Sequence, residues 1–285
     1  MLYNISGSPL AITSVYPADD ATDVPVTALL SATFNRDVVA PGVSKNATLN
    51  SSAGVEETWD LSAAVPATVS EYAIASATSA NITIGTSDSS DVLIDWGDGD
   101  FSVAAHNVQA THNYDSAYTG TIKVFTTATI TRWDSSAAGW SFALSALKEG
   151  LTYFRCTADN SITGTITDIP NSVGIFQLYG QSSLSGDLAD SNANLTFFLC
   201  LGGFNTVFVS NGATPAQTSM RYVYIQGVGL SAAEVDDVLI FLAQISTWTN
   251  EKIVNLAGNN APRTSASDTA VSTLQGYGVT VTTSS

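Results

Sequence analysis

Leu151-Thr-Tyr-Phe-Arg-Cys156 begins a pattern that returns as Val173-Gly-Ile-Phe-Gln-Leu178 and again as Leu195-Thr-Phe-Phe-Leu-Cys200. The three segments start 22 residues apart, and each has apolar residues at its first, fourth and sixth positions. Alternation over so short a segment indicates a half-buried β-strand. A fixed period of this kind indicates a repeat array, in which each unit buries its apolar face only against its neighbours. We therefore expect one short strand per repeat, with its apolar residues pointing inward.

Two further copies follow at wider spacing, Met220-x-x-Val223-x-Ile225 and Val254-x-Leu256, and asparagines follow the first and last copies at Asn160 and Asn260. The pattern resembles the leucine-rich repeat, L-x-x-L-x-L-x-x-N-x-L, whose period is about 20–29 residues. The resemblance implies a short leucine-rich-repeat solenoid over residues 134–285, ending in a C-terminal cap. Residues 130–147 are expected to open it, with Trp133 or Trp140 covering its first face.

The two cysteines occupy the same inward position two repeats apart, with Leu178 between them. Neighbouring strands lie ~4.8 Å apart, so Cys156 and Cys200 should be separated by about 10 Å. A disulfide requires Cα atoms within roughly 7 Å. We expect two free thiols in the core.

Helical signals appear only near the C-terminus. Ser231 and Glu234 form a capping-box pattern ahead of apolar residues at helical spacing. A second helix is expected over residues 267–275, with Gly276 as its stop and a final strand over residues 279–281.

The segments Ile12–Val26 and Leu30–Val38 carry a strand, a Pro-Ala-Asp turn and a second strand ending in Thr-Phe. They resemble bacterial immunoglobulin-like modules, which implies an N-terminal arm at residues 1–9 and a β-sandwich at 10–75. Residues 43–70 depart from the pattern, so this module is expected in a shortened form.

Val92-Leu-Ile-Asp-Trp-Gly-Asp-Gly99, followed by His112-Asn-Tyr114, Gly120 and Ile122-Lys-Val124, resembles PKD domains. This resemblance implies a second small sandwich at residues 76–133. The expected fold class is mainly β, with an immunoglobulin-like and PKD-like sandwich region, a leucine-rich-repeat solenoid and helices near the C-terminus.

The 285 residues include 9 Lys+Arg against 25 Asp+Glu, for a formal net charge of −16. Affinity for nucleic acid depends largely on Lys and Arg, so nucleic-acid binding is set aside. No apolar stretch approaches the ~20 residues of a membrane helix, and the opening residues lack a signal-peptide pattern. G-x-S-x-G, G-x-x-x-x-G-K and H-E-x-x-H motifs are absent. We expect no membrane span, no secretion signal and no enzymatic activity.

Strand alternation directs a second set of side chains outward from the array. A binding face is expected at Tyr153, Arg155, Gln177, Phe197, Tyr222 and Tyr224, with Ile175 and Leu199 between them. Aromatic residues and Arg dominate contact energies at interfaces. The alternatives are that they are ordinary β-formers or that they pack against sister subunits.

No cofactor is expected, with one alternative. Asp95, Asp98 and Asp100 could bind Ca²⁺ through their carboxylate oxygens. Otherwise Asp98 and Asp100 cap backbone N–H groups in a tight turn.

The combination of immunoglobulin-like, PKD-like and leucine-rich-repeat modules resembles surface proteins of tailed bacteriophages. They imply a structural protein on the virion surface, such as a head decoration protein, head fibre or tail accessory. Its partners would be the capsid or tail lattice and further copies of itself, with Leu2-Tyr-Asn-Ile-Ser6 and the first sandwich as the docking end. The alternative is a bacterial cell-surface or secreted adhesin that binds a host surface protein or glycan.

Overall fold

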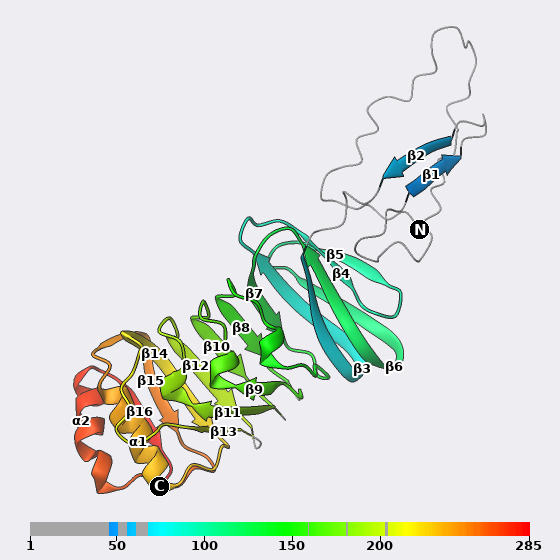
Figure 1. The fold of residues 1–285 in the computed structure, drawn as a ribbon. Coiled ribbons are helices and arrows are strands. Elements are labelled where there is room, and N and C mark those ends of the chain that lie inside the picture. Colours follow the sequence, from blue (N-terminus) through cyan, green and yellow to red (C-terminus); the bar gives the residue numbers. More distant parts are fainter. Residues whose placement is uncertain (1–45, 51–55, 61–67, 159, 181, 203–204) are drawn as a thin grey trace.

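The computed structural model describes residues 46–50, 56–60, 68–158, 160–180, 182–202 and 205–285. Within them the chain is mainly β, as predicted (Figure 1). An eleven-stranded sheet, a three-stranded sheet and a separate hairpin of β1 (Asn46–Asn50) and β2 (Glu56–Asp60) make up the strands. Among the described residues, no helix has the length and apolar character to cross a membrane.

The first half of the large sheet is antiparallel. Its order is β7-β3-β6-β4-β5, and two long strands dominate it. The strands are β3 (Thr68–Thr86), β4 (Val92–Asp95), β5 (Phe101–Ala104), β6 (Gln109–Thr126) and β7 (Ile130–Ser135). Along β4 and just beyond it, Val92, Ile94 and Trp96 are buried, in the alternation typical of a strand with one face in the core.

The expected sandwiches are not confirmed, because every strand described between residues 68 and 135 belongs to this one sheet. The boundary expected between residues 75 and 76 lies inside β3, and that between 133 and 134 lies inside β7. The arm at residues 1–9, which includes Leu2–Ser6 of the expected docking end, and most of the module at 10–75 lie outside the described residues.

The second half of the sheet is a parallel β-solenoid. After β7 the order is β8 (Tyr153–Cys156), β10 (Ile175–Leu178), β12 (Phe197–Leu201), β14 (Ser219–Gln226), β15 (Thr247–Leu256) and β16 (Thr280–Thr283). Phe154, Phe176, Phe198, Val223 and Val254 occupy one register position on successive strands. The repeat alignment is therefore confirmed.

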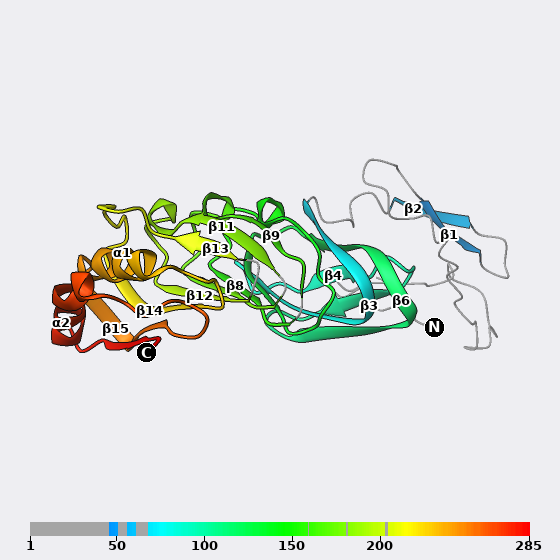
Figure 2. The ribbon, with the colours of Figure 1, turned by 90° about the horizontal axis from the view of Figure 1, so that it is seen from below.

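Each of the central coils contributes two strands instead of the expected one. The second set, β9 (Thr163–Thr165), β11 (Ser183–Asp187) and β13 (Thr206–Phe208), forms the three-stranded sheet, which lies opposite the large one in Figure 2. Short 3₁₀ turns follow β9 and β11 at Ile166–Asp168 and Leu188–Asp190. This arrangement is that of a β-helix more than of a leucine-rich repeat, because these segments are short and rich in Thr, Ser and Gly, with no helical periodicity.

Stacked aromatic rings fill the interior of the solenoid. The ring centroids of Phe154 and Phe176 lie 5.2 Å apart and those of Phe176 and Phe198 lie 5.8 Å apart. Trp133 extends the stack, 5.1 Å from Phe154. Cys156 and Cys200 are free and buried, with Leu178 between them in register, as predicted.

Two helices close the C-terminal end. Helix α1 (Ala232–Ala243) begins with the predicted capping box, in which Ser231 and Glu234 each bind the other's backbone N–H. Helix α2 (Asp268–Gly276) includes Gly276 as its last residue, so the predicted stop falls one position early. Two further 3₁₀ turns lie at Leu144–Ala146 and Ser265–Ser267. β7 pairs with β8, so the solenoid begins within residues 130–147, and Trp133 stacks on Phe154 at its first face. The other edge of β7 pairs with β3.

Candidate binding face

The structure brings all six predicted outward residues onto one face of the parallel sheet. Strand register aligns them in two rows that cross the strands. The first row is Arg132, Tyr153, Ile175, Phe197 and Tyr222, and the second is Asp134, Arg155, Gln177, Leu199 and Tyr224. We call the surface formed by Tyr153, Arg155, Gln177, Phe197, Tyr222 and Tyr224 the aromatic face. Each of these six side chains is partly exposed, whereas Leu199 is buried.

Three rings of the aromatic face stack on one another. Phe197 and Tyr222 lie 4.4 Å apart between centroids with an interplanar angle of 5°, and Tyr222 and Tyr224 lie 5.9 Å apart, also at 5°. Arg221 places its guanidinium 5.0 Å from the centroid of Phe197. Stacking of this kind holds each ring in one orientation, because a side chain that rotates loses its neighbours. The face is therefore preformed.

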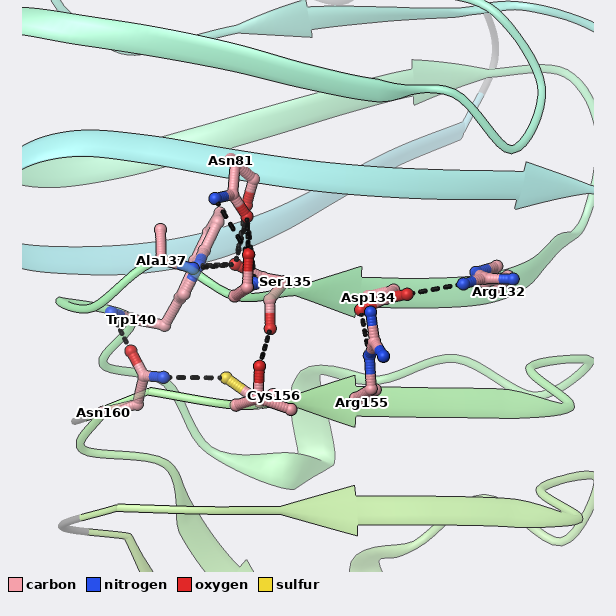
Figure 3. Close-up of polar contacts among 11 residues, drawn as sticks. Asn81, Arg132, Asp134, Ser135, Ala137, Trp140, Arg155, Cys156 and Asn160 are labelled. Carbon is pink, nitrogen blue, oxygen red and sulfur yellow. Dashed lines mark hydrogen bonds and ion pairs between the residues drawn. The ribbon is translucent and has the colours of Figure 1, made fainter.

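Two arginines at the other end of the face share one carboxylate (Figure 3). Asp134 is only 4% exposed, and it accepts hydrogen bonds from Arg132 Nη2 at 2.5 Å and Arg155 Nε at 2.6 Å. The Arg132 guanidinium also lies 4.5 Å from the centroid of the Tyr153 ring. A buried carboxylate needs such pairing to remain charged. The hydrogen bond to Asp134 raises the pKa of Arg155 above its ordinary value.

A polar network beside this trio fixes β7 against its neighbours. Ser135 Oγ donates to the carbonyl of Asn81 at 2.7 Å and accepts from Trp140 Nε1 at 2.6 Å. The buried Asn160 accepts a hydrogen bond from the Trp140 backbone N–H at 2.8 Å and donates to Cys156 Sγ at 3.1 Å (Figure 3). These bonds tie β3, β7 and the strand that carries Arg155 into one unit.

The Tyr222 phenol of the face is a hydrogen-bond donor at neutral pH. Burial raises the pKa of Tyr222 above its ordinary value, and burial likewise raises the pKa of Tyr179, which follows β10. A protonated phenol both donates and accepts hydrogen bonds. The face therefore combines flat apolar rings, hydroxyls and guanidinium groups.

The three aspartates proposed as a calcium site are not assembled as one. Asp98, Asp100 and His112 have ligand atoms within 4.8 Å of one another, whereas Asp95 accepts from the backbone N–H of Gly97. Asp98 accepts from the Asp100 N–H at 3.1 Å and bonds His112 Nε2 at 2.7 Å. Burial raises the pKa of Asp98, but the His112 and Asp100 hydrogen bonds together lower it more. Ca²⁺ takes six to eight oxygen ligands, of which the carboxylates of Asp98 and Asp100 supply only a part.

Arg132 and Asp134 were missed as face residues when the sequence was considered alone. Ile130, Trp133 and Ser135 repeat the spacing of Leu151, Phe154 and Cys156, so strand alternation would have placed Arg132 and Asp134 outward. The substitution of Ser for an apolar residue at position 135 conceals the match.

Comparisons of this chain with protein-family models, with curated proteins and with solved structures found no match. The function of the chain is therefore inferred from the geometry and chemistry of the aromatic face.

Proposed function

We propose that this chain is a non-enzymatic structural protein of a tailed-bacteriophage virion surface, and that its aromatic face binds a partner there. The virion location rests on the sequence resemblances described above. The observation that carries the binding role is the preformed face, with three stacked rings and two paired arginines on a regular sheet. Rigid aromatic residues and Arg supply binding energy at a low cost in side-chain entropy.

Two structural details support the resemblances to leucine-rich repeats and to PKD domains. Asn160 and Asn260 are buried, and each accepts a backbone N–H and donates to backbone carbonyls at the turn after a strand. Asn205 does the same for Leu184 and Gly202. Buried asparagines in this position support a relation to the leucine-rich repeat. The turn with positive φ at Gly97 and Gly99, next to the His112 and Tyr114 strand, supports a relation to PKD domains.

Location is tested by immunogold labelling with an antibody against the purified chain. We expect gold on intact virions from the source culture, at positions that follow the symmetry of the head or tail. Gold on intact bacterial cells and not on virions would favour the alternative, a bacterial surface adhesin. Label on neither surface would contradict both.

The face is tested by substitution. Phe197→Ser with Tyr222→Ser removes two stacked rings, and we expect the variant to lose binding to virions or cells that retain the parent chain. Phe208→Ser is the matched control, because Phe208 is a 37% exposed aromatic residue of β13, on the three-stranded sheet. Equal loss in the control, or full binding by the double variant, would contradict a role for the face.

A further inference from the structure

Three arginines lie on the aromatic face and its margin. Of the 9 Lys+Arg in a chain of net charge −16, Arg132, Arg155 and Arg221 lie there. Their acidic counterparts are Asp134, which both Arg132 and Arg155 contact, and Glu251, whose carboxylate is 3.9 Å from Arg221. One positive charge is left in excess, so the face differs in sign from the chain as a whole.

Asp134 holds two guanidinium groups in place without using up their donors. Each guanidinium has five N–H groups, and Asp134 takes one from Arg132 and one from Arg155. The two arginine side chains are 35% and 38% exposed, and although Arg132 Nε is buried, the side chains are partly open to a ligand. A guanidinium held in position binds a carboxylate in a bidentate geometry at little entropic cost.

We propose that the aromatic face binds an acidic polysaccharide, whose carboxylates pair with Arg132 and Arg155. Gln177 and the phenols of Tyr222 and Tyr224 would bind sugar hydroxyls. This inference rests on the proposed binding role of the face and names its ligand.

The regularity of the face favours a polymer over a folded acidic partner. Strand register places one side chain from each strand at an equivalent position along a straight row, and neighbouring strands lie ~4.8 Å apart. A polysaccharide offers carboxylates, hydroxyls and apolar ring faces in repeating order along a line. An uncharged chain would leave the arginine donors at one end of the face without partners.

Binding is measured by affinity electrophoresis through gels that contain polygalacturonate, with fully methyl-esterified galacturonan as the comparison. The two polymers share a backbone and differ in the carboxylate charge. We expect retardation only by polygalacturonate, and weaker retardation as salt is added. Equal retardation by both polymers would overturn the role of the arginines, and no retardation by either would overturn the ligand class.

The variants are Arg155→Gln and Gln177→Glu. We expect Arg155→Gln to weaken binding roughly tenfold, because a charge-assisted pair is lost. Lys148→Gln, which removes an exposed positive charge elsewhere on the solenoid, should bind as the parent does. Unchanged binding by Arg155→Gln would contradict the proposal.

Gln177→Glu tests the proposal even if Arg155→Gln fails to fold, because position 177 is outside the Asp134 trio. The new carboxylate lies in register with Arg155 and would compete with the ligand, so binding should fall, whereas Gln177→Lys should bind at least as tightly as the parent. The opposite order would overturn the proposal. Retardation by polyglutamate equal to that by polygalacturonate would show that an acidic protein suffices, and would overturn the polysaccharide assignment.

The two proposals fail separately. Gold on virions without retardation would leave the virion role intact and remove the ligand. Retardation without gold on any particle would leave the ligand assignment intact and contradict the virion role.

Discussion

At the scale of single residues, the two cysteines are small apolar groups of the core. Cys156 and Cys200 are both fully buried, and burial raises the pKa of each thiol far above its ordinary value. Because the thiolate is the reactive form, we expect neither thiol to react with Ellman's reagent at pH 8 in the native protein. Two thiols should react in 6 M guanidinium chloride. A native thiol titre of one or two would show that the coils open at equilibrium.

Asp236 is a buried carboxylate that joins the two C-terminal helices. It accepts hydrogen bonds from Ser267 Oγ at 2.5 Å and from the Thr264 N–H at 3.0 Å. Burial raises its pKa, but these hydrogen bonds together lower it below its ordinary value. A depressed pKa in the folded state stabilises the fold above the unfolded pKa of about 3.9, and this contribution is lost as pH falls through the folded value.

We therefore expect Asp236→Asn to lower the free energy of unfolding at pH 7 by about 1–3 kcal/mol. The difference from the parent chain should shrink below about pH 4. Urea denaturation at several pH values measures it. Asp237→Asn is the control of opposite sign, because burial, Asp236 and Glu234 raise the pKa of Asp237, so loss of its charge should not destabilise the fold at pH 7. A penalty for Asp236→Asn that stays undiminished as the pH falls through the folded pKa of Asp236 would contradict this account.

At the scale of elements, glycines end four successive strands of the solenoid at the same place. Gly180, Gly202, Gly227 and Gly258 each follow the last inward residue by two positions, and all have positive φ. At Gly202, φ is +133°, and an added Cβ would overlap the carbonyl oxygen of Gly180 in the preceding coil. Positive φ at these glycines lets the chain turn out of the large sheet, and at Gly202 the missing Cβ also lets two coils approach closely.

We expect Gly202→Ala to lower the free energy of unfolding by at least about 1–3 kcal/mol, because it adds backbone strain to a steric overlap. Gly276→Ala, at a position in α2 with no atom within 4 Å of the new Cβ, should be neutral or stabilising. Thermal unfolding followed by circular dichroism compares the two. Similar melting temperatures would show that the coils can separate at Gly202 without cost.

The elements that could be predicted from sequence are those with a repeated apolar pattern. The register of the parallel strands could be predicted because inward positions recur every 22 residues, at Phe154, Phe176 and Phe198. The three-stranded sheet was missed because segments such as Thr163–Thr165 are too short to show a period. The Asp134 trio was missed because its members come from two strands, one of which ends in Ser135 where the repeat has an apolar residue.

At the scale of the whole molecule, β7 joins the two halves of the large sheet. It pairs antiparallel with β3 and parallel with β8, so backbone hydrogen bonds cross from one half to the other without a gap. Aromatic contacts follow the same path. Trp133 contacts Tyr72 of β3 at 5.8 Å, Phe142 at 5.4 Å and Phe154 of β8 at 5.1 Å, measured between ring centroids. Contacts of this kind contribute about 0.5–1.5 kcal/mol each beyond the area they bury.

The contacts through β7 oppose the tendency of solenoids to unfold from their ends. A repeat array has stability close to a sum of nearest-neighbour terms, so its terminal coils can separate first. Here β3 pairs with β7 at one end, and at the other end α1 packs against α2, which packs against the edge strand β16. The interface energies between neighbouring coils should therefore prevent the terminal coils from separating first. The antiparallel half and the solenoid should then unfold together.

We expect hydrogen exchange, measured by mass spectrometry along a urea series, to give the same unfolding midpoint for peptides from β6 and from β14. Trp133→Ala should lower both midpoints together, at a cost of about 3–5 kcal/mol for the lost packing. Val103→Ala is the control, since Val103 is a 40% exposed residue of β5 outside the junction. If Trp133→Ala lowered the β6 midpoint and left that of β14 in place, the two halves would be separate folding units, and the aromatic face would form without the antiparallel strands.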